Sequence, residues 1–342
     1  SNARALLQYS QQKGYPIPCF QLGNEPTLYS YFYHVNVSPQ SLAHDFPTFK
    51  SVVHSYPHYS KSCILGPEVT NLTNPQHKQY FSQFLQAGGA KALSGITLHH
   101  YYRCAPDHPV NQNYFFDLSN FEFLEGQLQS ATAIAKQYAP GVPLWFSETS
   151  TLIINCPGDP HLRTTYLNGF LWLDKLGLST RYQFQHVIRH QFFSQLVVGT
   201  SDFTPHTDYY LTLLYKRLVQ GPVLKVLTST PTVRVYANCA NPQRYQKGAI
   251  VIYAINIQSS AVTLTFSQFH GQQLDLYMLT PGDHTGLSSK FIALNGKKLT
   301  MNGNELPPMP PKTVNGAHSV TLQGRSYGFV VIPHANVQPC KH

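Results

Sequence analysis

The protein has 342 residues and a mass of 38.5 kDa, about twice the size of an ordinary domain, which excludes a peptide or a disulfide-held miniprotein. Hydrophobic residues make up 42% of the chain, the mean hydropathy is -0.22, and no apolar run approaches the roughly 18 residues of a membrane helix, so no transmembrane segment is predicted. Only 11% of residues are charged and 13% are aromatic, which argues against disorder and against a coiled coil.

The net charge of +9 belongs mainly to the C-terminal third of the chain. Up to Pro222 there are 14 Lys and Arg against 12 Asp and Glu, and beyond it 10 against 3. No dense basic run occurs, so a solvated basic surface is favoured over nucleic-acid binding. Because 12 of the 17 histidines precede Pro222, mild acid would make that part more positive, and a pH-dependent hold on an anionic polymer is one hypothesis.

The first 222 residues alternate short apolar strands with amphipathic helices. We expect strands over residues 17–22, 62–66, 96–101, 144–148 and 182–189. We expect helices over residues 3–13, 42–53, 75–87, 121–138, 163–176 and 208–219. This repeat predicts an α/β domain over residues 1–222. Its five strands are fewer than the eight of a closed barrel, so either the sheet is open or the first strands of a barrel precede residue 1.

From residue 223 the pattern changes to alternating strands alone. They are expected over residues 232–237, 249–257, 262–266, 274–279, 291–294 and 328–333. Asn295-Gly296 is a two-residue hairpin signal, and residues 307–311 form a proline-rich loop. We therefore predict an all-β sandwich domain over residues 223–342.

The six cysteines allow one to three disulfides, and none of them forms a C-x-x-C metal or redox pair. Cys19 and Cys63 fall in neighbouring expected strands and fit ordinary buried thiols. The glycosylation sequons at Asn36 and Asn71 fit a secreted protein. An extracellular location is therefore expected.

Two acidic residues, Glu25 and Glu148, each follow an apolar strand at its C-terminal end. In β/α barrels that edge is the active-site face. Retaining glycosidases need two carboxyl groups about 5 to 5.5 Å apart, one protonated to assist the leaving oxygen and one ionised to attack the anomeric carbon. The alternative is a pair of strand-end carboxylates that only accept hydrogen bonds from loops.

Several motifs in chain order add to this pair, beginning with Asn24 directly before Glu25. They are residues 22–26, 98–102, 148–150, 169–178, 187–189, 294–296 and 327–329. In these motifs the chain resembles, essentially from end to end, the heparanases, which are endo-β-glucuronidases of glycoside hydrolase family 79. The resemblance implies a (β/α)8 TIM barrel followed by a β-sandwich, with Glu25 as general acid/base, Glu148 as nucleophile and the Asn24 amide on the sugar 2-hydroxyl.

The same resemblance accounts for the missing strands. In heparanases the first part of the barrel lies upstream, and an excised linker leaves a light chain and a heavy chain that fold together. An upstream light-chain or N-terminal barrel segment is thus an expected partner. For the 342-residue segment alone we expect a gapped barrel without activity.

His99 and Tyr101 alternate inward on the expected strand over residues 96–101 and match family residues that line the cleft. Tyr101 is expected to donate to the nucleophile and His99 to face the substrate. His100 and Tyr102 point outward, where barrel packing is favoured.

Arg189 and His190 close the last expected strand and could reach a sulfate or carboxylate of the substrate, although a structural ion pair suits Arg189 equally well. The other His, Cys and Asp residues show no metal-ligand spacing, and no glycine-rich phosphate loop occurs, so neither a metal nor a cofactor is expected. Most of the many Tyr and Phe residues are expected in the core, and some could stack on sugars.

Cys239 and Cys340 match the cysteine pair that ties the sandwich domain together in heparanases. Closing a loop of about 100 residues stabilises by up to ~4.7 kcal/mol in the chain-entropy description. Cys104 and Cys156 follow two strands that end on the active-site face, so a disulfide between their loops is possible.

Two loops depart from the family and leave the substrate open. Residues 70–78 replace a basic run that binds the sulfated chain, and residues 152–159 replace a glycine-rich loop that holds the substrate. Heparan sulfate is the first expected substrate, and hyaluronan, which leech relatives cleave, is the alternative glycosaminoglycan. A non-catalytic glycosaminoglycan-binding paralogue and a lectin-like sandwich are further alternatives. The expected location is secreted, in the extracellular matrix or the lysosome.

Overall fold

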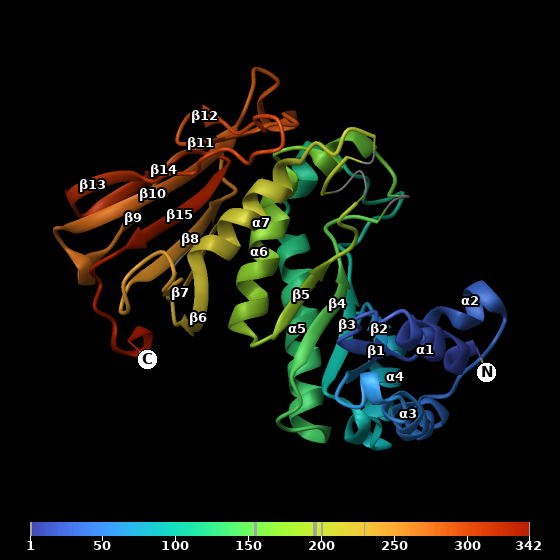
Figure 1. Cartoon of the computed structure of the whole chain (residues 1–342). Coiled ribbons are helices and arrows are strands. Elements are labelled where there is room, and N and C mark those ends of the chain that lie inside the picture. Colours follow the sequence, from blue (N-terminus) through green and yellow to red (C-terminus); the bar gives the residue numbers. More distant parts are fainter. Residues whose placement is uncertain (1, 154–155, 194–196, 200, 229, 342) are drawn as a thin grey trace. The chain divides into compact units, whose positions relative to one another are not determined.

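The computed structural model describes residues 2–153, 156–193, 197–199, 201–228 and 230–341 (Figure 1). These residues form two compact units, and the chain passes between them several times. The parallel-sheet unit comprises Ser1–Tyr101, Phe123–Ser150 and Tyr182–His190. The antiparallel-sheet unit comprises Tyr102–Glu122, Thr151–Arg181 and Gln191–His342. The boundary expected after residue 222 stays a prediction.

Five parallel strands in sequential order form the sheet of the first unit (Figure 1). They are β1 (Cys19–Gln21), β2 (Cys63–Thr70), β3 (Gly95–His100), β4 (Leu144–Thr149) and β5 (His186–Arg189). All five strands of the sequence prediction are present, and neighbouring strands pair in parallel throughout. Since the strands run in the same direction, their C-terminal ends share one edge of the sheet, where the candidate catalytic residues were expected.

The helices of this unit are α1 (Asn2–Gln12), α2 (Tyr29–Tyr33), α3 (Pro39–His54), α4 (Pro75–Gln86) and the larger part of α5 (Leu118–Tyr138). Short 3-10 helices are η1 (Pro26–Leu28), η2 (Pro57–Tyr59) and η3 (Gly89–Ala92). Helix α4 begins as predicted: the Asn74 side chain accepts a hydrogen bond from the Gln76 N–H at 2.9 Å, and Pro75 has no N–H and so needs no acceptor. Fully buried Phe46 and Phe84 stack edge to face between α3 and α4 and help fix the helices beside the sheet.

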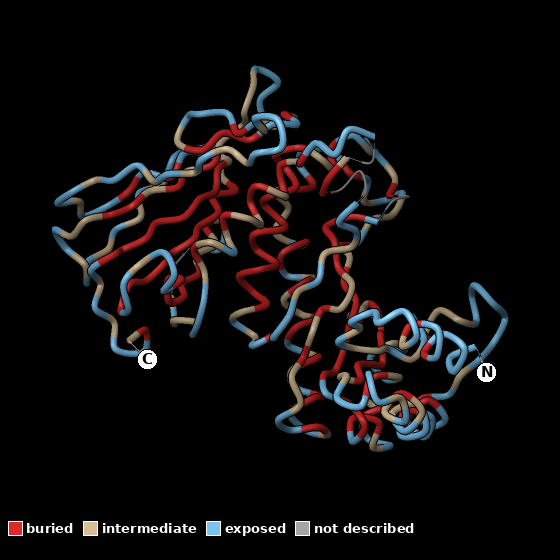
Figure 2. The backbone as a smooth tube through the Cα atoms, viewed as in Figure 1, coloured by how far each residue is buried: buried red, intermediate tan, exposed pale blue. Residues whose placement is uncertain are grey.

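The antiparallel-sheet unit holds an eight-stranded sheet and a separate pair of strands. The larger sheet has the order β12-β11-β10-β15-β8-β7-β6, with β13 also paired to β10, and the smaller pairs β9 with β14. The bounds are β6 (Val219–Leu224), β7 (Val233–Ala240), β8 (Ile250–Asn256), β9 (Val262–Thr265), β10 (Gln272–Pro281), β11 (Ile292–Leu294), β12 (Lys297–Lys298), β13 (Lys312–Ala317), β14 (Ser319–Leu322) and β15 (Ser326–Ile332). The central strands β8 and β15 are buried along their whole length (Figure 2).

Two long helices, α6 (Asn168–Arg181) and α7 (Thr207–Leu218), belong to the same unit. Its 3-10 helices are η4 (Gln112–Phe116), η5 (Pro160–Thr164), η6 (Ser267–Phe269), η7 (Gly286–Ser288) and η8 (Gln338–Cys340). Helix α6 is buried on nearly every side, and its glycines let aromatic rings of the sheet approach: a Cβ at Gly169 would collide with the Tyr327 ring. None of the helices in the described part of the chain combines the length and apolarity that a membrane crossing requires.

Four of these strands, β6, β12, β13 and β14, were not among those expected, although the Asn295-Gly296 turn signal implied a partner strand for β11. The sequence of β13 is polar, and most of its residues are exposed, so it lacks the apolar alternation that reveals a half-buried strand. The Asn295-Gly296 hairpin is confirmed: φ is 49° at Asn295 and 82° at Gly296, and β11 pairs antiparallel with β12.

Three disulfides are present. Cys239 is bonded to Cys340 and Cys104 to Cys156, across sequence separations of 101 and 52 residues. The expectation that Cys19 and Cys63 are thiols is wrong, because they form a disulfide too. The two residues are register partners on β1 and β2 with Cα atoms 4.4 Å apart, which sequence alone does not reveal.

The sequons differ in exposure. Asn36 is exposed in the segment after α2, whereas Asn71 is half-buried, and its side-chain oxygen accepts a hydrogen bond from the Thr73 hydroxyl. Residues 154–155 of the unusual loop over residues 152–159 lie outside the described residues.

Candidate active site

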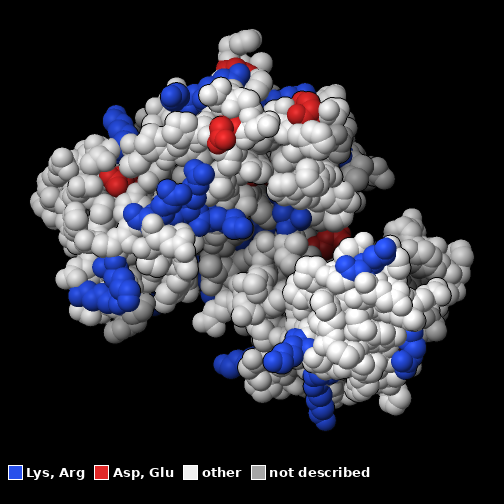
Figure 3. Space-filling view, in the orientation of Figure 1, with Lys and Arg blue, Asp and Glu red and all other residues white. Residues whose placement is uncertain are grey.

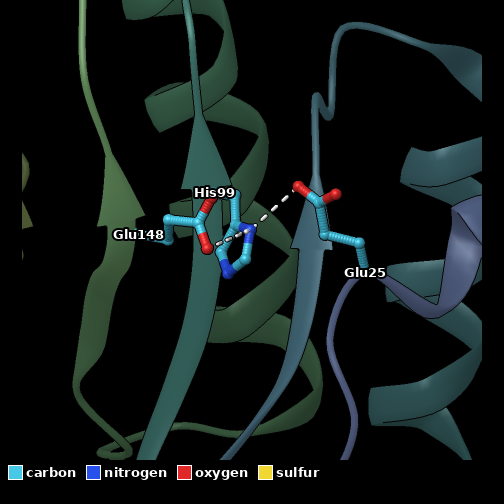
Figure 4. Close-up of side chains that lie close together, drawn as sticks. All are labelled: Glu25, His99 and Glu148. Carbon is cyan, nitrogen blue, oxygen red and sulfur yellow. Dashed lines mark hydrogen bonds and ion pairs between the residues drawn. The ribbon is translucent and has the colours of Figure 1, made fainter. Parts of the chain in front are cut away.

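Four titratable side chains meet at the C-terminal edge of the parallel sheet. Glu25 follows β1, Glu68 lies near the end of β2, His99 lies in β3, and Glu148 lies in β4. Figure 4 shows Glu25 and Glu148 pointing toward His99 from opposite sides. His99 and Glu148 are also register partners of adjacent strands, so the sheet itself places them side by side.

Glu25 and Glu148 form the carboxylate pair that the sequence predicted at this edge. One oxygen of each, together with a ring nitrogen of His99, forms a group whose atoms all lie within 4.8 Å of one another. The side chains are 20% and 27% exposed, so both reach solvent while the rest of the cluster is covered. This spacing suits a retaining glycosidase better than an inverting one, which leaves room for a water between carboxyl groups about 6.5–9.5 Å apart.

A tight turn holds Glu25. Its φ of 51° lies in the left-handed region, and it follows Gly23 with φ of 82°. The turn is fastened by the Asn24 N–H, which donates to the Tyr29 hydroxyl at 3.0 Å, and by Pro26, which begins η1. A non-glycine residue in this conformation costs about 1–2 kcal/mol. Such strained conformations recur at functional sites, where the backbone must hold a side chain in one direction.

His99 is buried between carboxylates, with a side chain that is 1% exposed. Its Nδ1 lies 2.9 Å from an oxygen of Glu25, and its Nε2 is hydrogen-bonded to Glu68. Burial lowers the pKa of His99, but the hydrogen bonds to Glu25 and Glu68 and the charges of Glu68 and Glu148 outweigh it and raise the pKa to about 9. Both ring nitrogens of His99 contact protein carboxylates, and the expectation that His99 faces the substrate stays a prediction.

Tyr101 contacts Glu148, as the alternation along the strand predicted. Its hydroxyl donates to the carboxylate at 2.7 Å and lies 3.1 Å from Nδ1 of His190. Burial and the Glu148 carboxylate raise the pKa of Tyr101, so the phenol keeps its proton and remains a donor. His190 itself lies 4.0 Å from Glu148. The nucleophile candidate is therefore held from one side by a neutral donor.

Glu68 is the member of the cluster that sequence reasoning missed. It is 2% exposed, and its carboxylate accepts hydrogen bonds from Gln21, from Ser147 at 2.7 Å and from His99. The one available signal was an acidic residue inside the apolar run of residues 63–70, where a buried carboxylate needs partners.

The remaining candidates lie around this centre. Asn24 is exposed next to Glu25, and Arg189 is half-buried on β5, paired with Thr149 of β4. His100 points away from the cluster and packs near Phe146, with ring centroids 6.0 Å apart, in line with the expected packing role.

Glu25, His99 and Glu148 have the spacing of a possible metal site. Both ring nitrogens of His99 already face protein carboxylates, Nδ1 that of Glu25 and Nε2 that of Glu68. The raised pKa of His99 favours an imidazolium among these carboxylates over a metal ligand.

An exposed aromatic surface follows Glu25 directly. On α2 the side chains of Tyr31, Phe32 and Tyr33 are 78%, 59% and 68% exposed. Tyr33 packs edge to face on Tyr29, whose hydroxyl binds the turn of Glu25. Aromatic faces exposed beside a polar site suit stacking on apolar faces of sugar rings.

A family model described as "Glycosyl hydrolase family 79, N-terminal domain" matches residues 1–177, just over half of the chain. The chain belongs to glycosyl hydrolase family 79. This membership agrees with the carboxylate pair and the parallel sheet that carries it.

Relatives cover nearly the whole chain. It is 32% identical to "Heparanase" of Bos taurus over 99% of its length and 31% identical to "Hyaluronoglucuronidase" of Hirudo nipponia over 100%, alignments that span 63% and 69% of those proteins. It is 29% identical to "Inactive heparanase-2" of Homo sapiens over 100% of its length and 60% of that protein's. The chain thus spans under two thirds of the heparanase it matches.

A solved structure supports the fold. A 4-O-alpha-L-rhamnosyl-beta-D-glucuronidase from Fusarium oxysporum 12S superposes with a TM-score of 0.67 at 15% identity, covering 96% of this chain and 73% of that one. The parallel β/α sheet and the antiparallel sheets of this family 79 member therefore share the fold of that structure.

Proposed function

We propose that this chain carries both catalytic carboxylates of a retaining endo-β-glucuronidase that hydrolyses glucuronic acid linkages in a glycosaminoglycan. The proposal rests on the pair Glu25 and Glu148, whose nearest oxygens lie within 4.8 Å at the C-terminal edge of a parallel sheet. Membership of family 79 supports the same chemistry. The proposal concerns the complete parent protein, since the chain spans 63% of the bovine heparanase.

The reaction assigns separate roles to the two carboxylates. Glu148 attacks the anomeric carbon while Glu25 donates its proton to the leaving glycosidic oxygen, which leaves a glycosyl ester on Glu148. Glu25 then takes a proton from water, the water oxygen attacks the anomeric carbon, and Glu148 is released. The hydrogen bond from Tyr101 fixes one oxygen of Glu148 and leaves the other for attack.

Binding roles go to residues around this pair. Asn24 is proposed to bind the sugar 2-hydroxyl, and Arg189 and His190 to face the carboxylate of the uronic acid. The side chain of His190 is 38% exposed and lies 4.0 Å from Glu148, so a ligand at the nucleophile comes within its reach.

Heparan sulfate is the first proposed substrate and hyaluronan the second candidate. Residues 70–78 hold a single lysine, Lys78, where heparanases have a basic run. On the face drawn in Figure 3, Lys and Arg form several separate groups rather than one continuous track. These observations and the 31% identity to the leech hyaluronoglucuronidase are the grounds for hyaluronan as the second candidate, while the 32% identity to the bovine heparanase supports heparan sulfate as the first. The exposed rings of α2 suit either polymer.

A non-catalytic role, suggested by the similarity to inactive heparanase-2, has less support. This chain has glutamates at both expected catalytic positions and a tyrosine donor on Glu148. A protein that only binds polysaccharide has no need of a carboxylate pair at this spacing.

The architecture proposed for the complete protein is a (β/α)8 barrel whose first strands come from an upstream light-chain segment, followed by a β-sandwich. We place the catalytic domain in residues 1–222 and the sandwich in residues 223–342. Three disulfides and two sequons support a secreted, extracellular-matrix or lysosomal protein.

The deciding experiment incubates the complete parent protein with heparan sulfate and with hyaluronan at mildly acidic pH and measures product size. Shortening of heparan sulfate supports the first substrate, and shortening of hyaluronan alone makes the altered loops the specificity determinant. Retained binding without cleavage of either would move the protein to the non-catalytic class.

A further inference from the structure

Glu68 has no part in the two-carboxylate mechanism, yet it is the most deeply buried carboxylate of the cluster, at 2% exposure. Three side-chain donors surround it: Gln21 from β1, His99 from β3 and Ser147 from β4. The hydroxyl of Thr97 also accepts from its backbone N–H at 3.2 Å. A buried charge that is held this completely has a fixed position.

His99 can donate to both neighbouring carboxyl groups only when both of its ring nitrogens carry hydrogen. Its Nδ1 faces Glu25, and its Nε2 faces Glu68. A neutral imidazole has one N–H, so one carboxylate would then meet a lone pair. Glu148 adds negative charge 3.9 Å from Nδ1, while Arg189 and His190 approach the cluster from β5 through Tyr101.

The protonation of His99 decides where the proton of Glu25 resides. When Nδ1 donates to one oxygen of Glu25, a proton on the carboxyl group must occupy the other oxygen, which points away from His99 in Figure 4. A neutral His99 that donates to Glu68 would instead present a lone pair to Glu25. The catalytic proton would then bond to His99 and be withheld from the leaving oxygen.

We propose that Glu68 is a positioning residue, which holds His99 as a donor at both nitrogens and thereby keeps the proton of Glu25 on the oxygen that can reach the substrate. This inference rests on the proposed role of Glu25 as the acid. Glu68 does not touch the substrate, and its effect passes through His99.

The first test uses the complete parent protein labelled with ¹⁵N and ¹³C in histidine, with the His99 signals assigned by their loss in His99→Gln. We expect both ring nitrogens to be protonated at pH 7 and titration well above the usual 6.5. In Glu68→Gln the midpoint should fall by about 2 units, whereas Glu68→Asp, which keeps the charge, should retain most of the elevation. Glu305→Gln, an exposed carboxylate in the antiparallel-sheet unit, is the matched control and should leave the midpoint unchanged.

A neutral His99 at pH 7 in the unsubstituted protein would overturn the proposal, and that result does not depend on how the variants fold. An unchanged midpoint in Glu68→Gln would overturn it as well. These readouts need no turnover, so they separate this inference from the proposed hydrolase activity.

The kinetic arm measures kcat and KM across pH. We expect Glu68→Gln to lower kcat about 10- to 100-fold with little change in KM, and to move the alkaline limb of the profile to lower pH, because His99 then loses its proton earlier. Glu68→Asp should restore most of the rate. Loss of rate in Glu68→Gln with an unshifted profile would reduce Glu68 to a packing role and contradict the proposal.

Discussion

Each unit contains a cluster of charged side chains, and a comparison of the two distinguishes a cluster suited to catalysis from one that stabilises the fold. In the antiparallel-sheet unit, Asp174 is fully buried and accepts from the Arg234 side chain at 2.8 Å and from the Tyr236 hydroxyl. The Arg234 side chain is 13% exposed and lies over the Phe121 ring. Here the ion pair of Asp174 and Arg234 is largely shielded from solvent.

In the parallel-sheet unit, three carboxylates surround one imidazole, and two of them, Glu25 and Glu148, stay 20% and 27% exposed. The acidic side chains outnumber the imidazole, and the two less buried acids lie on the solvent side. An unbalanced cluster with exposed acids can exchange protons and bind an electrophilic carbon, while a balanced buried pair can only hold elements together. Charge balance and exposure, rather than burial alone, identify the reactive cluster.

The largest expected effect comes from removing the exposed carboxylates. Glu25→Gln and Glu148→Gln should each reduce turnover by roughly 10³-fold or more, because a proton donor or the nucleophile is lost, while polymer binding remains nearly unchanged. Product sizing and calorimetric binding of the same oligosaccharides check both parts. Wild-type rates in either variant would remove the catalytic assignment.

Substitution in the cluster of Asp174 and Arg234 should instead change the stability of the protein. Asp174→Asn removes the carboxylate that binds Arg234 and should destabilise the protein by about 3–5 kcal/mol, with little change in rate for the molecules that remain folded. Thermal unfolding and initial rates at 25 °C measure the two effects. Asp107→Asn, which breaks the exposed pair with Arg103, is the control and should cost less than about 0.5 kcal/mol.

The clusters should also differ in pH dependence. The pKa of His99 is raised to about 9 from the 6.5 of an unfolded chain, so its contribution to stability is complete below pH 6.5 and is lost as pH rises toward 9. The loss amounts to at most about 3 kcal/mol. Asp174 raises the pKa of Arg234 despite burial, so this ion pair should not titrate in that window. The free energy of unfolding should therefore fall between pH 6 and pH 9 in the unsubstituted protein but not in His99→Gln. Equal slopes of this free energy against pH in the two proteins would contradict the assignment.

The sequence predicted the two exposed acids but not the carboxylate behind them. Glu25 and Glu148 follow apolar strands, and the common edge of a parallel sheet follows from the β/α repeat. Glu68 was missed because the strand was expected to end at Gly66, before a proline. In the structure β2 continues to Thr70 through a register shift between Pro67 and Val69, with φ of 61° at Glu68. Such an irregular strand has no signature in the periodicity.

The surroundings of His99 and of α2 could not be predicted from the sequence either. Alternation placed His99 inward, but its partners Glu68 and Glu25 lie 31 and 74 residues away in the chain, and only the folded structure brings them together. The aromatic run of α2 resembles core sequence, although Tyr31, Phe32 and Tyr33 are mostly exposed. Local pattern predicts the direction of a side chain, whereas its environment depends on tertiary packing.

A smaller effect is expected when the hydroxyl that donates to Glu148, that of Tyr101, is removed. Tyr101→Phe removes the hydrogen bond to Glu148 and should lower kcat about 10- to 100-fold, which corresponds to about 1.4–2.7 kcal/mol, with KM nearly constant. Tyr102→Phe, at the next residue, removes a buried bond to the Leu171 carbonyl and should lower the melting temperature instead. A lower melting temperature in Tyr101→Phe and a lower kcat in Tyr102→Phe would contradict the distinction between a catalytic and a structural hydrogen bond.

The smallest expected effect concerns the exposed aromatic surface of α2. Replacing Tyr31 and Phe32 together by Ala should raise KM for long polymers several-fold, about 1 kcal/mol, because stacking area is lost while the carboxylates stay in place. The kcat and the stability should change little, since both rings are more than half exposed. Initial rates with short and long hyaluronan and heparan sulfate chains measure this. A drop in kcat with constant KM would show that α2 acts through the turn of Glu25 and not by binding sugar, because Tyr29 connects the helix to that turn.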